Sequence, residues 1–186
     1  ECAFAYRDSI FKKSEGKDYI ITHVAFRLSE GGTPNLSYKD LVAYFAGRQT
    51  PTLAEVRCAV LHIRTRKFPA LATHGTAGSF FKNPIIPKEQ FDALKKKYPD
   101  LPGFPLNPQP STLNAIKIPL AWILDKVCGL KGFTQGKAAL WKDQPLVLTA
   151  EKGASAGDVC MLAEKVARTV KEKTGIVIEC EVQSVS

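Results

Sequence analysis

Residues 155–182 read SAGDVCMLAEKVARTVKEKTGIVIECEV and combine a strong helix signal with a strand signal. Ser155, with Asp158 three residues later, is typical of a helix N-terminus, because each side chain can accept a hydrogen bond from the other residue's backbone N–H. Gly175 predicts the end of the helix, since glycine readily adopts the left-handed conformation found there. Between these points apolar residues recur at helical spacing: Val159, Leu162, Ala163, Val166 and Val170.

A strand pattern follows this helix directly. Residues 176–182 alternate, with apolar side chains on one face and Glu179 and Glu181 on the other. Further helices are predicted from Thr52 (with Glu55 in capping-box position), over 87–97 and from Pro119 to about Gly129, and further strands over 19–28, 79–86, 138–141 and 146–150. Residues 68–78 and 99–110 are predicted to be irregular connections. Because helices and strands interleave, the sequence predicts an α+β fold.

Composition places the chain among ordinary globular proteins. It has 186 residues, of which 45% are apolar and 24% charged, and no apolar run approaches the ~20 residues of a membrane span. The five cysteines are an odd number without a CxxC pair, which predicts reduced thiols rather than disulfides or a zinc site. The net charge of +8 favours an anionic partner, or describes a lysine-rich solvated surface. No interleaving of aromatic and basic residues points to nucleic acid.

Three segments carry chemistry that purely structural sequence does not need: YRDSIFK at 6–12, GTAGSFFKNP at 75–84 and ECEV at 179–182. The small residues before Ser79 would let the backbone approach a ligand closely. Each segment also has a plain interpretation: a surface turn with local ion pairs, an ordinary loop with two core phenylalanines, and a strand with solvent-facing carboxylates. No metal-ligand spacing and no glycine-rich phosphate loop occurs. Residue chemistry alone therefore indicates a basic α/β protein with a candidate anion site.

YRDSIFK, GSFFKNP and the E-x-E-V pattern, in this order, resemble the UDP-N-acetylenolpyruvoylglucosamine reductase (MurB) family. Other pieces agree in order and spacing: LSYKDL at 36–41, CAVLHIRTRK at 58–67, IK at 116–117, AWILD at 121–125 and LKG at 130–132. The resemblance covers nearly the whole chain. The loop around Tyr38 points to the subclass that retains it, often called type I.

The resemblance implies a bacterial, cytoplasmic flavoenzyme of peptidoglycan synthesis, with neither nucleic acid nor a membrane as partner. NADPH would reduce FAD, and the reduced flavin would pass a hydride to UDP-N-acetylglucosamine enolpyruvate to give UDP-N-acetylmuramate. Hydride addition increases the negative charge on the enolpyruvyl carboxylate. That charge must be stabilised as it develops, and an acid must then protonate the neighbouring carbon.

The motifs assign roles to individual residues. Arg7 matches the family's carboxylate-binding arginine, which also belongs to the partial cofactor site of this chain, and Glu181 matches its partner. Glu181 would have to carry or share a proton in order to help an anion rather than repel it. Ser79 matches the proton donor, and contacts to the UDP-sugar are implied for Tyr38, Lys67, Asn83 and Lys117. Cys180 departs from the family pattern, which commonly has proline there.

In this family the N-terminal half carries the glycine-rich pyrophosphate loops and most of the FAD site. The resemblance therefore implies that residues 1–68 end the FAD-binding domain, that 69–175 form a small mixed α/β substrate-binding domain, and that 176–186 return to the FAD side. The missing N-terminal half would be a partner, and we expect this chain alone to bind FAD poorly and to lack reductase activity. Two alternatives stay open: a non-catalytic UDP-sugar-binding module, and a basic nucleic-acid-binding protein whose affinity would fall steeply with salt.

Overall fold

The computed structural model describes residues 2–4, 7–16, 18–46, 48, 50–106 and 114–183. Tyr6, the last part of the predicted connection 99–110 and residues 184–186 lie outside the described residues. The chain forms two compact units, Glu1–Val56 and Arg57–Ser186, and each is described by itself. The expected domain boundaries at residues 68 and 175 stay predictions. Within the described ranges, no helix is both long enough and apolar enough to cross a membrane.

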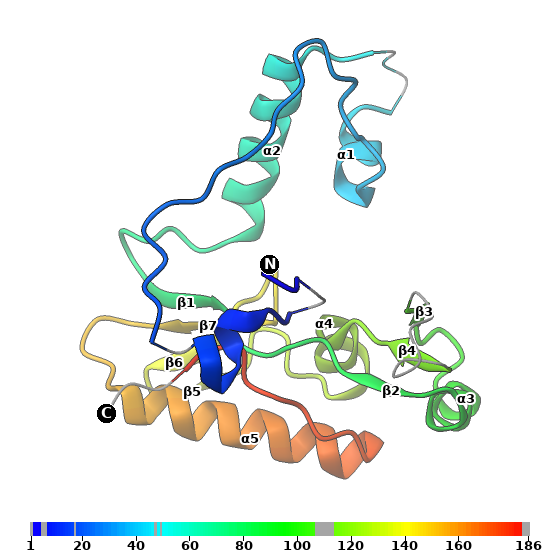
Figure 1. The fold of residues 1–186 in the computed structure, drawn as a ribbon. Coiled ribbons are helices and arrows are strands. Elements are labelled where there is room, and N and C mark those ends of the chain that lie inside the picture. Colours follow the sequence, from blue (N-terminus) through cyan, green and yellow to red (C-terminus); the bar gives the residue numbers. More distant parts are fainter. Residues whose placement is uncertain are drawn as a thin grey trace. The chain divides into compact units, whose positions relative to one another are not determined.

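The first unit has little regular structure. Its elements are η1 (Ile10–Lys12), η2 (Ser14–Gly16) and α1 (Lys39–Tyr44). The strand predicted over 19–28 is wrong for this structure, because the segment pairs with no strand among the described residues and Figure 1 draws it as coil.

The helix α2 (Leu53–Lys67) begins in the first unit and continues in the second. Its predicted capping box is confirmed. The Thr52 N–H donates to Glu55 Oε2 at 2.8 Å, and the Glu55 N–H donates to Thr52 Oγ1 at 3.2 Å. These bonds satisfy backbone donors that the first turn of a helix leaves without intrahelical partners.

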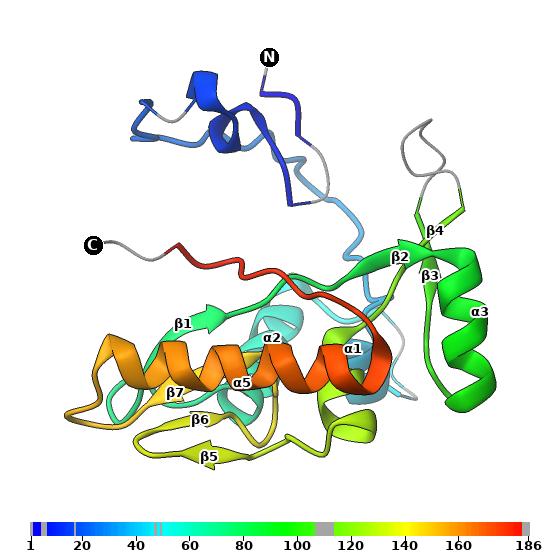
Figure 2. The same cartoon turned by 90° about the horizontal axis from the view of Figure 1, so that it is seen from below.

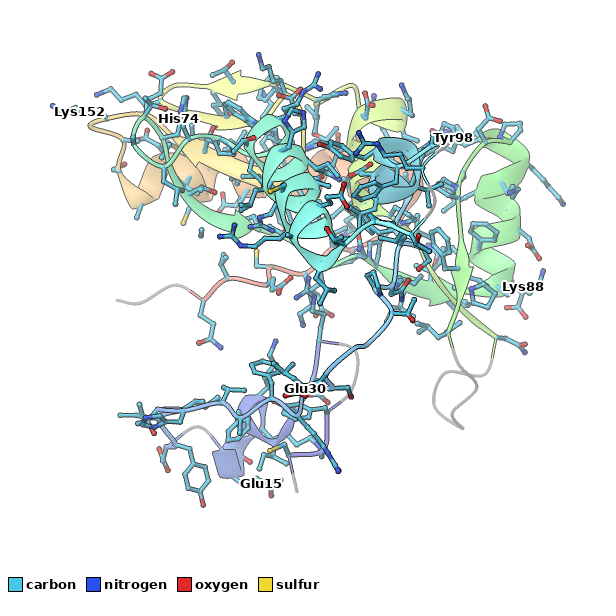
Figure 3. All side chains as sticks on the ribbon, turned by 90° about the horizontal axis from the view of Figure 1, so that it is seen from above. Glu15, Glu30, His74, Lys88, Tyr98 and Lys152 are labelled. Carbon is cyan, nitrogen blue, oxygen red and sulfur yellow. The ribbon has the colours of Figure 1, made fainter. Side chains whose placement is uncertain are left out.

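A four-stranded antiparallel sheet forms one layer of the second unit. Its order is β1–β7–β6–β5, with β1 (Gly75–Ser79), β5 (Thr134–Gln135), β6 (Ala138–Leu140) and β7 (Val147–Ala150). The predicted pairing of the segments now called β6 and β7 is confirmed. The helix α5 (Ala156–Thr174) lies along one face of this sheet in Figures 1 and 2. In Figure 3, His74 and Lys152 mark the end of the sheet where Gly75 pairs with Ala150.

The helix α5 matches its prediction closely. Ser155 and Asp158 form the capping box, and Gly175 ends the helix at φ 71°. The buried residues are four of the five predicted: Leu162, Ala163, Val166 and Val170. Because burial of a large aliphatic side chain contributes about 1.5–3 kcal/mol, this face attaches α5 firmly to the sheet.

A second sheet has three antiparallel strands in the order β2–β4–β3, namely β2 (Ile85–Pro87), β4 (Ala115–Lys117) and β3 (Phe104–Pro105). The helix α3 (Lys88–Lys97) follows β2, and Lys88 and Tyr98 mark its two ends in Figure 3. After β4, α4 (Leu120–Trp122) continues into the π-helical turn η3 (Ile123–Val127), so the helix predicted after Pro119 is confirmed. One hydrophobic core joins both sheets to these helices, which confirms the α+β class.

The predicted boundaries around Ser79 are wrong. Residues 75–78 form the start of β1 instead of a loop, because backbone pairing with β7 requires no large side chains. The strand predicted over 79–86 is divided: the first sheet ends at Ser79 and the second begins at Ile85. The strand predicted over 176–182 is also wrong, since only a single bridge forms there.

Candidate active site

Ser79 is the last residue of β1, and a local irregularity sets its position. The β1–β7 register shifts between Thr76 and Ser79, where Ser79 pairs with Val147. Gly78 has φ 82°, a conformation that an L side chain rarely adopts, and its N–H donates to Thr76 Oγ1 at 3.0 Å. The half-buried Ser79 is therefore presented at the end of a strand by a glycine that the turn requires.

Glu181 is held against the residues that follow Ser79. The Glu181 N–H donates to the Phe80 carbonyl at 2.8 Å, and the Lys82 N–H donates to the Glu179 carbonyl at 2.9 Å. Phe81 and Cys180 form the antiparallel bridge between these two bonds. The side chain of Glu181 is half-buried, and its Oε2 atom is shielded from solvent. Two of the candidate catalytic residues, Ser79 and Glu181, are thus brought onto adjacent chain segments.

A charged pair reinforces this register. Lys82 Nζ lies 2.8 Å from Glu179 Oε2, with 33% and 72% of the two side chains exposed. An exposed pair of this kind contributes only about 0.2–1 kcal/mol, so the backbone bonds are the main connection. Sequence reasoning missed this contact, although Lys82 lies in GSFFKNP and Glu179 in ECEV, two motifs of complementary charge.

Asn83 links this segment to the helix α4. Its Oδ1 atom accepts a hydrogen bond from the Leu120 N–H at 2.9 Å, across 37 residues of sequence. Pro119 is the N-cap of α4 and its side chain makes no capping bond. Asn83 therefore satisfies a helix N-terminal donor from outside the helix, a contact that the sequence pattern did not predict.

Lys117 is placed by the same part of the fold. It ends β4, where it is paired with Ile85 on one side and Phe104 on the other, and it is half-buried. The Ile118 N–H donates to the Pro84 carbonyl at 2.9 Å, directly after Asn83. The two candidate UDP-sugar contacts Asn83 and Lys117 therefore belong to neighbouring, hydrogen-bonded segments.

The remaining candidates are distributed over both units. Lys67 is the half-buried last residue of α2 and belongs to the second unit. Arg7 and Tyr38 belong to the first unit; Arg7 is exposed with φ 55°, and Tyr38 is the N-cap of α1 with 57% of its side chain exposed. Hydrogen bonds thus connect the segments that carry Ser79, Glu181, Asn83 and Lys117, and the site assignments of all the candidate residues stay predictions.

An apolar groove of about 600 Å³ lies between α5 and the residues that follow it. Neither Ser79 nor Glu181 lines this groove, although their neighbours Phe80, Cys180 and Val182 do. Cys160 and Cys180 both line it. Burial raises the pKa of the Cys180 thiol, and the nearby Cys160 raises that pKa further.

Comparison with known proteins identifies the family. The family described as "UDP-N-acetylenolpyruvoylglucosamine reductase, C-terminal domain" matches residues 70–185, which include Ser79, Asn83, Lys117 and Glu181. The chain belongs to this MurB family.

Relatives with the family name match over almost all of the chain. UDP-N-acetylenolpyruvoylglucosamine reductase of Cupriavidus pinatubonensis is 40% identical over 97% of this chain and 52% of its own length. The corresponding proteins of Bacteroides fragilis and Neisseria meningitidis are 40% and 39% identical, over 98% and 97% of this chain. The chain spans about half the length of these curated relatives.

The three longest helices of the described part do not present N-termini suited to the pyrophosphate of FAD. Helix N-termini are the common place for a pyrophosphate, because their N–H groups and dipole attract anions. The three longest helices of the described part, α2, α3 and α5, each carry an acidic residue in the first turn: Glu55, Glu89 and Asp158. The carboxylates of Glu55 in α2 and Asp158 in α5 already accept hydrogen bonds from the N-cap N–H groups, and their negative charge would repel a phosphate.

Proposed function

We propose that this chain is the C-terminal, substrate-binding part of a cytoplasmic FAD-dependent reductase that converts UDP-N-acetylglucosamine enolpyruvate to UDP-N-acetylmuramate with NADPH. The observation that carries the proposal is the hydrogen bond from the Glu181 N–H to the Phe80 carbonyl, since it places Glu181 beside the segment of Ser79. Membership of the MurB family supports the assignment. In the whole protein, FAD would supply the hydride that adds to the vinyl carbon of the substrate.

Arg7 and Glu181 are assigned to the substrate carboxylate. A guanidinium binds a carboxylate through two parallel N–H donors, and this arrangement stabilises the negative charge that develops during the reaction. Glu181 assists if it presents a protonated or proton-sharing carboxyl to that charge. The half-buried side chain of Glu181, with its Oε2 atom shielded from solvent, supports a place for this residue in the site.

Ser79 is assigned to the proton transfer. Its Oγ–H would protonate the carbon next to the one that accepts the hydride, and Oγ would then regain a proton from solvent. A serine hydroxyl is a weak acid in water, so the role requires neighbouring charge. The position of Ser79 at a strand end, one residue before the Phe80 carbonyl that binds Glu181, supports it.

Lys67, Lys117, Asn83 and Tyr38 are assigned to the UDP-sugar. The half-buried Lys67 and Lys117 each carry a charge that suits a diphosphate, and this gives part of the net charge of +8 a specific use. Asn83 uses Oδ1 within the fold, so we assign the ligand contact to its Nδ2 donor. The side chain of Tyr38 is more than half exposed, which suits a residue on a ligand-binding loop.

A narrower function applies to the chain in isolation. The motif assignments give this chain four UDP-sugar contacts, Tyr38, Lys67, Asn83 and Lys117, but only Arg7 of the cofactor site, which favours binding of the UDP-sugar without flavin. On this account the purified chain is a nucleotide-sugar-binding module, and catalysis requires polypeptide that supplies the FAD site.

Calorimetric titration with UDP-N-acetylglucosamine enolpyruvate tests this function. We expect the wild-type chain to bind. Lys117→Ala should raise the dissociation constant about 10- to 100-fold, because a hydrogen bond to a charged group contributes roughly 1.5–3 kcal/mol. Lys96→Ala is the matched control, because Lys96 is an exposed lysine on α3 and should leave the affinity unchanged. A folded chain that does not bind the nucleotide sugar, or two variants with equal affinity, would contradict the assignment.

A further inference from the structure

Two cysteines share the apolar groove between α5 and the residues that follow it. Cys160 belongs to α5, Cys180 belongs to the segment after the helix, and both line the groove. Both are free thiols with exposed side chains. Free cysteines are among the most buried residues and are inert when buried, so two exposed thiols in one groove are chemically available.

The two elements that form the groove direct these thiols into the same space. The lining residues of α5 follow helical spacing and so form one stripe that includes Ala156, Cys160, Ala163 and Ala167. The segment after the helix contributes every second residue, which places Ile178, Cys180 and Val182 on one face of an extended chain. Figures 1 and 2 both show this segment running back along α5.

The chain lengths on the two sides of Gly175 agree with this placement. Cys160 lies 15 residues before Gly175, which is about 22 Å along a helix. Cys180 lies five residues after Gly175, and an extended chain covers about 17 Å over that length. The returning segment therefore carries Cys180 to within about one helical turn of the level of Cys160.

An electrostatic interaction between the two thiols supports their proximity. Burial raises the pKa of Cys180, and Cys160 raises that pKa further. A charge on one group affects the titration of another appreciably only at short range.

We propose that Cys160 and Cys180 are a redox modification site, a dithiol that a low-molecular-weight disulfide oxidises to an intramolecular disulfide across the groove. In the first step the Cys160 thiolate attacks one sulfur of the small disulfide, forms a mixed disulfide and releases one small thiolate. In the second step the Cys180 thiolate attacks the Cys160 sulfur, and the second small thiolate leaves. Two cysteine thiols are thus oxidised, the small disulfide is reduced to two thiols, and these two thiols take up the two protons that the cysteines lose.

The raised pKa of Cys180 determines the order of the two steps. Because little of this thiol is ionised at neutral pH, the first attack on a small disulfide is assigned to Cys160. Once the mixed disulfide lies in the groove, its sulfur is close to Cys180, and proximity accelerates the second attack.

The disulfide would connect α5 to the segment that carries Glu181. Cys180 forms the backbone bridge with Phe81, so oxidation would link α5 through this one residue to the chain that follows Ser79. In a reducing compartment, disulfides are usually transient and either catalytic or redox-sensing, and we assign this pair to the redox-sensing kind. The inference rests on the groove and its two thiols, not on the proposed reaction.

The test treats the reduced, dilute chain with oxidised glutathione, then alkylates the remaining thiols and digests the protein with trypsin. We expect the number of free thiols to fall from five to three and a linked pair of peptides to join Cys160 with Cys180. Lys165 and Arg168 lie between the two cysteines, so trypsin separates them unless the disulfide holds the peptides together. Dithiothreitol should restore all five thiols.

Two serine variants separate this pair from the other cysteines. Cys180→Ser should stop at a mixed disulfide with glutathione on Cys160, because the second step then has no thiol. Cys58→Ser is the matched control, since Cys58 is also an exposed free thiol but lies on α2 outside the groove, and it should form the Cys160–Cys180 bond at the wild-type rate. Oxidation should raise the Tm of the wild type, because the bond restricts the unfolded chain, and should leave the Tm of Cys180→Ser within about 1 °C.

Several results would overturn the proposal. They are the persistence of all five thiols, glutathione that stays on Cys160 in the wild-type chain, a disulfide that joins another pair or two chains, and a Tm that falls on oxidation. The last result would mean that the two Cα atoms lie outside the range of about 7 Å that an unstrained disulfide allows. Neither flavin nor nucleotide sugar enters this experiment, so its failure is distinguishable from a failure of the proposed function.

Discussion

Replacing Asn83 by alanine separates its role in the fold from its role at the ligand. In the structure Asn83 Oδ1 accepts from the N–H of Leu120, a residue with no exposed surface. Alanine leaves that buried donor unsatisfied, which costs about 1–3 kcal/mol. With a loss of roughly 2–4 °C in Tm for each kcal/mol in a chain of this size, we expect Tm to fall by about 2–12 °C.

Tryptophan fluorescence is the appropriate assay for this variant. The two tryptophans of the chain, Trp122 and Trp141, both lie in the second unit, so thermal unfolding followed by fluorescence reports on the unit that contains Asn83. Asn83→Asp is the matched variant, because it keeps an oxygen acceptor for Leu120 and replaces the Nδ2 donor with a negative charge.

The two variants should therefore behave differently. Asn83→Asp should keep a Tm within about 1 °C of the wild type, since the acceptor for Leu120 remains, and should lose affinity for the UDP-sugar, whose diphosphate the new charge repels. Asn83→Ala should lose stability as well. If Asn83→Ala unfolds at the wild-type temperature, or if Asn83→Asp is as unstable as Asn83→Ala, the capping role of Asn83 is wrong.

Three further predictions concern local features. Hydrogen bonds from the Ser155 backbone and hydroxyl lower the pKa of Asp158, so the ionised cap stabilises the folded chain at pH values above the usual aspartate pKa and loses this effect as pH falls through the lowered pKa. The free energies of unfolding in urea of the wild type and of Asp158→Asn should therefore converge at acidic pH, and a difference that persists there contradicts this. Gly175→Ala should cost about 1 kcal/mol, because the residue adopts φ 71°, and equal stability in chemical denaturation would rule out the strain. Burial and Cys160 raise the pKa of Cys180, so iodoacetamide should label it more slowly at pH 8 than a model thiol and faster after Cys160→Ser; mass spectrometry that finds Cys180 labelled first would refute this.

Local side-chain chemistry accounts for the parts of the fold that were predictable from sequence. The capping pairs of Thr52 with Glu55 and of Ser155 with Asp158 fix helix starts within a few residues, and Gly175 fixes the end of α5. Such signals depend only on neighbours in sequence, so a single chain contains all the information they need.

Pairing between distant segments explains what was not predictable. The small residues 75–78 look like a loop, and only their partner β7 makes them a strand. The Asn83 contact to Leu120 spans 37 residues and has no local pattern. Residues 19–28 show the reverse case, a clear strand pattern without a partner among the described residues.

The same distinction between local patterns and long-range contacts applies to the candidate site. Motif resemblance selected Ser79 and Glu181 without indicating how they meet, and the bridge between Phe81 and Cys180 supplies that connection. No residue pattern by itself predicted the Lys82–Glu179 pair or the groove that Phe80 and Cys180 line.

The proposed function is tested most directly by mixing the purified chain with excess FAD, removing unbound flavin by gel filtration, and assaying the protein with NADPH and UDP-N-acetylglucosamine enolpyruvate. We expect a colourless, inactive chain that becomes yellow and forms UDP-N-acetylmuramate only when the unmatched half of a relative is added. A yellow, active preparation of the chain alone would contradict its assignment as the substrate-binding part of a longer reductase.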